Sequence, residues 1–362
     1  MSPQRSERPR LFRLAPRNPL ISEALEGEGW REAEDEATWD LLWSNALPPS
    51  RTFKACREGR LVNHFPGIPA LTRKDALYWT LEAARLGAAS VYRFFPRTHV
   101  MPEDREAFLA AAARAPSALW IYKPCADSCG RGVRMLVDPE RVPRARGHLV
   151  QRYIATPHLL DGFKYTLRCY VAVTSLDPLR VYLFDDGFAK LTSRPFTTSR
   201  AHLADRLVHL TNPDVQRLNK EVATSSRNLT HGQYRARLRS SGIDDEALWR
   251  QIRRLVAATL IAARDLLLEA SGRAFPRPRG SAFELLGFDL LVDRRMKVWL
   301  IECNMSPSLS VEADSTTPAA QEERDIKRRV VRGVLGLVGA LSPDAGHGFA
   351  PVIPSEDTAD LL

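Results

Sequence analysis

The chain lacks long hydrophobic runs and metal-type cysteine spacing, and we expect no secretory leader. No apolar stretch reaches the roughly 18 residues expected of a transmembrane helix, and the Arg-rich N-terminus has no apolar leader segment. The five cysteines among 362 residues are dispersed without the paired spacing of a zinc site. An odd, dispersed set predicts free thiols in a reducing compartment. We therefore expect a cytoplasmic protein.

Acidic residues are in the minority, which bears on the choice of partner. The formal net charge is +9 and the pI is about 9.5. A basic surface attracts a nucleic acid, an anionic membrane or an acidic peptide, and charge alone does not choose among them. No helix-turn-helix or RNA-binding signature is present. We expect an acidic protein partner, no nucleic acid and no membrane, and a monomer.

The size and composition predict several packed lobes, since 44% of the residues are hydrophobic. Residues 1–40 are predicted to form a partly disordered extension. Trp39, Leu42 and Trp43 are expected to dock this extension on the folded body. Residues 41–115 read as an N-terminal and central region, 116–342 as the main catalytic region, and 343–362 as a polar, mobile tail.

Hydrophobic periodicity predicts both helices and strands. The expected helices cover residues 72–86, 103–113, 244–270 and 319–342, and the expected strands cover 119–123, 133–137, 149–153, 167–174 and 179–184. Thr72 and Asp75 have the spacing of a capping box at the start of the first helix. Most strands follow one another as hairpins instead of alternating with helices. The prediction is an α+β fold with mostly antiparallel sheets, and not a Rossmann fold.

Two apolar, strand-like runs, at residues 283–289 and 299–309, carry carboxylate and amide side chains where a core strand normally has none. If Arg294 and Arg295 form a two-residue turn, Leu300 lies opposite Asp289, and Glu302 and Asn304 share its face. A one-residue slip would separate them. Buried carboxylates need a compensating cation, and Mg²⁺ that carries nucleotide phosphates is a natural one. The alternative is an ordinary hairpin with carboxylates at its edge.

A strand that ends in Lys123 precedes a glycine-rich turn, Gly130-Arg131-Gly132. Such a turn can direct backbone N–H groups at phosphates. The motif Gly-x-x-x-x-Gly-Lys-Ser/Thr of a P-loop is absent. The turn is either a plain hairpin turn or a flap over a nucleotide.

Many ordered motifs together resemble the tubulin–tyrosine ligase-like family of ATP-grasp amide ligases. They include Asn-His-Phe-Pro-Gly at 63–67, Leu-Thr-Arg-Lys-Asp at 71–75, Phe-Pro-Arg-Thr at 95–98, Gln-Arg-Tyr-Ile at 151–154, Lys-Tyr-Thr-Leu-Arg at 164–168, His-Leu-Thr-Asn at 209–212, and the hairpin at 283–309. The resemblance runs from about residue 60 to 340, and the motifs are most similar to those of the glutamylase members.

The resemblance implies roles for individual residues, in a site that takes ATP and Mg²⁺. The nucleotide-binding set is Lys74, Lys123, Arg131, Gly132, Gln151, Arg152, Tyr153, Ile154, Lys164, Thr211 and Asn212. The metal ligands are Asp289, Glu302 and Asn304, and the catalytic residues are Arg168, Lys190 and Glu302. Arg168 is expected to contact the transferred phosphate or the incoming free amino acid.

Three positions depart from the family pattern. Thr166 stands where the family has an aspartate, Lys190 where it has an arginine, and Pro213 where a tyrosine or similar residue is usual. Lysine keeps the charge of arginine but loses its bidentate fork. These changes leave ATP binding expected and put amino-acid choice and activity in doubt.

The resemblance implies an ATP-dependent ligase that forms an amide between an acceptor glutamate side chain and a free amino acid, foremost glutamate, through an acylphosphate. The acceptor would be the acidic tail of tubulin or another acidic protein, with association with the cytoskeleton. The alternatives are a glycine or tyrosine ligase, on tubulin or a non-tubulin protein, and a nucleotide-binding pseudo-ligase that only docks a partner.

Overall fold

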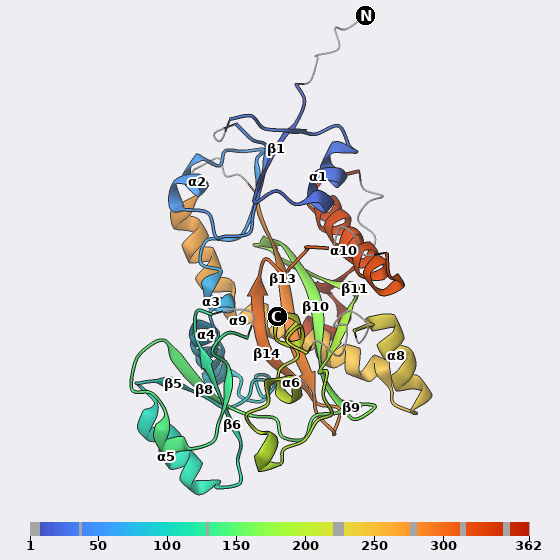
Figure 1. Ribbon diagram of the computed structural model, residues 1–362. Coiled ribbons are helices and arrows are strands. Elements are labelled where there is room, and N and C mark those ends of the chain that lie inside the picture. Colours follow the sequence, from blue (N-terminus) through green and yellow to red (C-terminus); the bar gives the residue numbers. More distant parts are fainter. Residues whose placement is uncertain are drawn as a thin grey trace, which may run out of the picture.

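The computed structural model describes residues 8–35, 38–127, 130–219, 228–275, 281–311, 316–342 and 348–361. Its strands form an 11-stranded sheet and a separate 4-stranded sheet, with helices packed against both (Figure 1). The mixed, mostly antiparallel architecture confirms the predicted α+β class.

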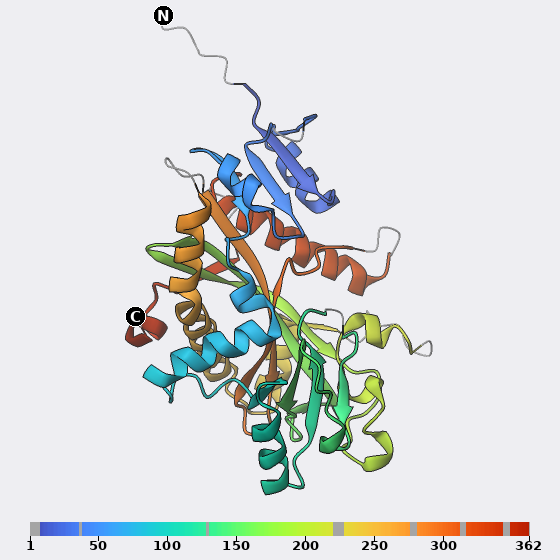
Figure 2. The ribbon, with the colours of Figure 1, turned by 90° about the vertical axis from the view of Figure 1, so that its left-hand side faces the viewer.

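Four long antiparallel strands make the centre of the large sheet. They are β10 (Phe163–Leu176), β11 (Leu179–Leu191), β13 (Ser281–Val292) and β14 (Val298–Met305). The 30-residue helix α9 (Asp245–Ala274) buries its apolar side against them (Figure 2). Helix α10 (Pro318–Leu337) belongs to a second core cluster with α1 (Pro19–Glu26). The predicted strands and helices of this part are confirmed, but the strands are longer than expected and α10 ends at Leu337, short of the predicted residue 342.

The N-terminal segment extends the large sheet. Strands β1 (Leu11–Ala15), β2 (Arg31–Glu32), β3 (Leu41–Ser44) and β4 (Leu61–Asn63) pair in parallel, and β4 pairs with β13. Helix α2 (Ser50–Ala55) follows β3. Phe12, Leu25 and Trp30 of this segment lie in the same core cluster as α10. Much of the stretch expected to be an extension is therefore part of the folded body, at the top of Figure 1.

The small sheet forms a lobe of its own. Its strands are β5 (Thr98–Met101), β6 (Trp120–Pro124), β7 (Arg134–Leu136) and β8 (His148–Arg152), and α5 (Arg105–Arg114) packs Phe108 on Trp120. Helices α3 (Pro69–Thr72) and α4 (Lys74–Gly87) connect it to the large sheet.

The capping box expected at Thr72 and Asp75 is wrong. The N-cap of α4 is Arg73, which makes no side-chain cap bond, because Thr72 still belongs to α3 and donates its hydroxyl to the carbonyl of Ile68. The Asp75 carboxylate accepts from Arg73 instead, at 2.9 Å.

The C-terminal residues are also better ordered than a polar tail suggests. Strand β15 (Phe349–Ile353) pairs with β11, and a 3-10 helix (Glu356–Leu361) packs on α9. Arg253 donates to Asp357 at 2.6 Å. The expected mobility is therefore wrong for residues 348–361, while 343–347 lie outside the described residues. In the described ranges, no helix is both long and apolar enough to cross a membrane.

Candidate functional site

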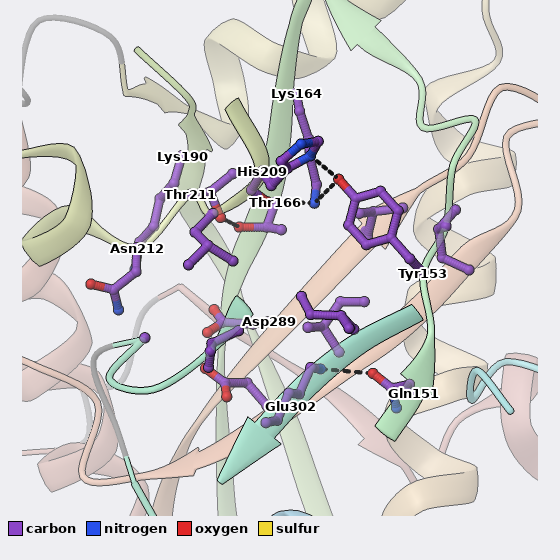
Figure 3. A pocket seen from close by; sticks show the side chains of 18 of the residues that line it. Gln151, Tyr153, Lys164, Thr166, Lys190, His209, Thr211, Asn212, Asp289 and Glu302 are labelled. Carbon is purple, nitrogen blue, oxygen red and sulfur yellow. Dashed lines mark hydrogen bonds between the residues drawn. The ribbon is translucent and has the colours of Figure 1, made fainter. Parts of the chain in front are cut away.

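A cleft of about 910 Å³, counting its open mouth, lies between the small and the large sheet. Strands β6 and β8 form one wall, and β10, β11, β13 and β14 form the other (Figure 3). Short helices α6 (Arg206–His209) and α7 (Pro213–Gln216) border it. The lining residues are Lys74, Ile121, Lys123, Gly130, Val133, Gln151, Arg152, Tyr153, Ile154, Lys164, Thr166, Arg168, Lys190, His209, Leu210, Thr211, Asn212, Pro213, Asp289, Leu291, Ile301 and Glu302.

The two candidate metal-binding carboxylates form a cross-strand pair. Asp289 of β13 lies opposite Glu302 of β14, and Asn304 is opposite Gly287. The expected two-residue turn and the pairing of Leu300 with Asp289 are wrong: residues 293–297 connect the strands, and Leu300 pairs with Leu290 in the core below. That turn alone would send Glu302 to the core face. A bulge at Ile301 shifts the register once more and returns Glu302 and Asn304 to the face of Asp289.

Arg168 lies opposite Asp289 on the neighbouring strand β10 and binds both of its oxygens. Nε donates to Oδ1 at 2.7 Å and Nη2 to Oδ2 at 2.9 Å. Burial opposes both charges, but the ion pair outweighs it, so the pKa of Arg168 rises and that of Asp289 falls to about 2. Both groups therefore stay charged at neutral pH.

Two lysines of the cleft, Lys123 and Lys164, are buried, and Lys190 is half-buried. Burial lowers the pKa of Lys123 to about 8 and those of Lys164 and Lys190 to about 7, with Arg168 adding to the effect at Lys190. Lys123 donates to the Oε1 atom of Gln151 at 2.7 Å. Lys74 donates to the carbonyl of Asp127 at 2.7 Å, and its Nζ atom lies 3.4 Å from a Glu302 oxygen. A polyanion in the cleft would raise these lysine pKa values again.

A chain of hydrogen bonds through Tyr153 and His209 fixes the position of the Lys164 ammonium (Figure 3). Its ammonium donates to the carbonyl of His209 at 2.7 Å and to the Tyr153 hydroxyl at 3.1 Å. Burial, and then Lys164, lower the pKa of His209 to about 4, so the ring is neutral. Its Nε2 donates to the carbonyl of His202, so Nδ1 accepts from the Tyr153 hydroxyl at 2.9 Å. The motif at 209–212 contains His209, but only the fold brings its ring to Tyr153 and its carbonyl to Lys164.

The departures from the family pattern meet at one end of the cleft. Thr166 and Lys190 are paired across β10 and β11. The hydroxyl of Thr166 makes a 2.6 Å hydrogen bond with that of Thr211. Asn212 caps α7 through a 2.9 Å bond from Asp214, and Pro213 is its first residue, a position that suits proline. Pro213 is thus compatible with the local structure.

Most of the residues predicted for the site line one cleft. Three do not: Arg131 is exposed beside Asp127, Gly132 faces Pro124, and Asn304 lies just behind the carboxylates. Of the glycine-rich turn, Gly130 lines the cleft, and Arg131 and Gly132 do not. Ser128 and Cys129 lie outside the described residues. The apolar lining by Ile121, Val133, Leu210, Leu291 and Ile301 was missed. Leu291 could have been found, because it follows Asp289 at strand spacing.

The donor set around Asp289 fits Mg²⁺ that is brought by a nucleotide. Within the described ranges, no group of three or more His, Cys, Asp or Glu side chains is gathered. Asp289 and Glu302 supply two carboxylates, and Asn304 donates to an Asp289 oxygen at 3.0 Å. Mg²⁺ uses one or two protein carboxylates and completes its shell with water and phosphate oxygens. A larger protein cage would be needed for Ca²⁺.

A cationic cleft between two mostly antiparallel sheets, with Ile121, Tyr153 and Leu210 as an apolar cluster in its lining, is the arrangement of an ATP-grasp-like fold. The chain belongs to the tubulin-tyrosine ligase family, whose family model matches residues 53–340. This confirms the resemblance drawn from the motifs.

Curated relatives carry names of glutamylases. The chain is 33% identical over 335 residues to tubulin monoglutamylase TTLL4 of Homo sapiens. This match covers 90% of the chain and 27% of that protein. It is 29% identical over 352 residues to human tubulin polyglutamylase TTLL5, covering 94% and 27%, and 31% identical over 326 residues to tubulin polyglutamylase ttll6 of Danio rerio, covering 88% and 41%. The chain thus spans less than half the length of each of these relatives.

Proposed function

We propose that the chain is an ATP- and Mg²⁺-dependent ligase that joins glutamate to a glutamate side chain of an acidic protein tail, with tubulin as the first candidate acceptor. Membership of the family and the names of the relatives support the reaction class and the amino acid. We further propose that it acts as a cytoplasmic monomer associated with the cytoskeleton.

The observation that carries the proposal is the charge of the cleft. Six cationic side chains, Lys74, Lys123, Arg152, Lys164, Arg168 and Lys190, line it against two carboxylates, Asp289 and Glu302. Asp289 and Glu323 attract Lys190 electrostatically, but among the described residues no hydrogen bond or close ion pair holds its ammonium. Such an excess of buried positive charge is costly unless an anion enters. A nucleoside triphosphate supplies the anion, and its base suits the apolar cluster formed by Ile121, Tyr153 and Leu210.

The residues divide the work by position. Lys123 and Lys164 would neutralise phosphates, and Asp289 with Glu302 and Asn304 would hold Mg²⁺, which supplies charge neutralisation at the phosphates when bound. Arg168 of β10 and Lys190 of β11 line the wall formed by the large sheet, where they would meet the transferred phosphate and the carboxylate of the incoming amino acid. The roles of Gln151, Arg152, Ile154, Thr211 and Asn212 around the nucleotide, and of Arg131 and Gly132 at the flap, are part of the same proposal.

The proposed reaction has two steps. An oxygen of the acceptor side-chain carboxylate attacks the γ-phosphorus, and the bond to ADP breaks. The amine of the free amino acid then attacks the acyl carbon, phosphate leaves, and the amine loses a proton. Because both steps gather negative charge, positioning and charge neutralisation by lysine and arginine are the contributions required of the protein.

Mass spectrometry of acidic acceptor peptides provides the test. The purified chain is incubated with ATP, Mg²⁺ and an equal mixture of glutamate, glycine and tyrosine, with Asp289→Asn as the inactive control. Glutamate addition supports the proposal, and addition of glycine or tyrosine contradicts the choice of amino acid. Nucleotide binding without any addition, to tubulin-tail peptides or other acidic proteins, would favour a pseudo-ligase that only docks a partner.

Salt dependence gives a second readout. Attraction between a basic surface and an acidic tail is screened over roughly 8 Å at physiological ionic strength. Acceptor affinity should fall as salt rises, and an affinity that is independent of salt would contradict an acidic acceptor.

A further inference from the structure

One buried histidine ties together three segments behind the candidate metal site. His64 follows β4, is 1% exposed, and has a left-handed φ of 84°. Its backbone N–H donates to the carbonyl of Phe283 at 2.7 Å. The motif at residues 63–67 that contains it has no role in the nucleotide site described above.

The ring is held from both sides. Nε2 lies 2.8 Å from the carbonyl oxygen of Ser44, which can only accept, so Nε2 carries a proton. Asn63 donates to the same carbonyl at 2.7 Å, which explains why the two donors lie 3.1 Å apart. Nδ1 lies 2.7 Å from Oε1 of Glu284, which is 0% exposed. Burial opposes a charge on His64, but Glu284 outweighs it and raises the histidine pKa.

The third partner is Ser306, which follows β14. Its hydroxyl oxygen is 3.2 Å from Nε2, whose single N–H is directed to the Ser44 carbonyl at 2.8 Å, so the hydroxyl accepts the longer branch of a shared hydrogen bond. Ser306 has a φ of 48°, a left-handed conformation that a residue other than glycine adopts only when its surroundings hold it. We call Glu284, His64 and Ser306 the His64 clamp.

The clamp lies at the open end of the β13–β14 ladder. The last paired residues are Leu286 and Met305, and the pair before them is Gly287 and Asn304. Glu284 and Ser306 stand just beyond this end, so the imidazole bridges the two strands where backbone pairing stops. Pro307 also packs there, where a Cβ on Gly287 would come within 2.9 Å of it. Unclamped strand ends open locally at low free-energy cost.

We propose that Glu284, His64 and Ser306 are positioning residues for the candidate metal site, because they hold the end of β14 so that Asn304 stays beside Asp289. The inference rests on the proposed function. It assigns to the 63–67 motif the task of fixing a metal-binding strand from behind, through contacts that never reach nucleotide or acceptor. A clamp that served packing alone would affect stability without changing the demand for Mg²⁺.

Ser306→Ala is the sharpest variant, because it removes a single hydroxyl from the clamp. The exposed Ser308 in the same segment provides the matched control, Ser308→Ala. Binding of a non-hydrolysable ATP analogue by the full chain is titrated with Mg²⁺. We expect Ser306→Ala to require about threefold or more Mg²⁺ for half-maximal binding, in line with the loss of one hydrogen bond. Metal-free binding and the behaviour of Ser308→Ala should match the wild type.

Hydrogen exchange supplies a readout that is independent of ligand. The amides of Asn304 and Met305 should exchange several-fold faster in Ser306→Ala than in wild type or Ser308→Ala. Glu284→Gln, with its fold checked by circular dichroism, should shift both measurements further; if it does not fold, Ser306→Ala still decides.

The outcomes separate the two ideas. Wild-type Mg²⁺ demand and exchange in Ser306→Ala would overturn the positioning role, and so would equal shifts in Ser306→Ala and Ser308→Ala. If the wild-type chain itself shows no Mg²⁺-dependent nucleotide binding, the proposed function is the part that fails.

Discussion

Arg168 grips Asp289 at two points, with Nε on Oδ1 and Nη2 on Oδ2 at 2.7 and 2.9 Å, and the two residues sit opposite each other on adjacent strands. Their side chains are only 12% and 14% exposed. The pair therefore joins the part of the cleft that would hold the metal to the part that would hold the transferred group. A substitution of either residue should therefore alter the position and charge environment of the other.

Asp289→Asn should lower the free energy of unfolding of the ligand-free protein by about 3 kcal/mol, because it leaves the Arg168 guanidinium buried without its carboxylate. Urea unfolding followed by circular dichroism measures the change. The exposed pair of Arg237 and Asp161 offers a control, and Asp161→Asn should cost less than about 1 kcal/mol. Equal losses in the two variants would show that the buried pair has no special weight.

Glu302→Gln should abolish ligation and leave the fold intact. It removes one negative charge from the carboxylate pair that would bind Mg²⁺. Product formation is followed by mass spectrometry, and circular dichroism checks the fold. The exposed Glu106 on α5 gives the control Glu106→Gln, which should retain activity. Near-normal turnover in a folded Glu302→Gln protein would refute the metal assignment.

Lys123→Ala should weaken ATP binding more than acceptor binding. Loss of one charge-assisted contact costs roughly 1.5 to 3 kcal/mol, or about ten- to a hundredfold in Kd. Calorimetry measures both affinities, with exposed Lys54→Ala as the control. An unchanged ATP affinity would place the phosphates away from Lys123 and make the following glycine-rich loop an ordinary turn.

ATP binding should weaken as the pH rises above about 7 to 8, the range in which Lys164, Lys190 and Lys123 lose protons in the free protein. Phosphates raise these pKa values, so binding takes up protons between the free and the bound pKa. The affinity is full below the free pKa and is lost as the pH rises toward the bound one. Calorimetry at about pH 8.5 in two buffers of different ionisation enthalpy counts the protons. Binding without proton uptake would mean that these lysines do not face the phosphates.

Lys190→Arg should lower the apparent KM for the amino acid and leave the KM for ATP unchanged. A guanidinium presents a planar fork to a carboxylate, which an ammonium cannot do. Thr166→Asp, at the paired position, restores the carboxylate of the family pattern and should act together with it. Steady-state kinetics with each amino acid measure the effect. If neither change, alone or combined, alters activity, then Thr166 and Lys190 do not contact the amino acid.

Local sequence signals were sufficient for much of the fold and the site. Alternation and helical periodicity predicted the long strands β10 and β11 and the helices α9 and α10, because these patterns follow from which side chains must be buried. Lys123, Asp289 and Glu302 could be chosen because charges in apolar strands need a ligand or a partner, whereas Lys164 and Arg168 were implied only by the resemblance to the family. The order of motifs was enough to identify the family.

Tertiary structure decided what depended on register and on distant partners. The bulge at Ile301 determines which face Glu302 occupies, and no local pattern in the hairpin indicates a one-residue insertion. The chain from Lys164 through Tyr153 to His209 joins residues up to 56 positions apart, and the bond between His64 and Glu284 spans 220 positions. The amino-acid sequence thus determined which groups this protein carries and roughly where its strands run. Only the packed sheets decided which groups meet, because contacts across strands depend on a register that all the strands set together.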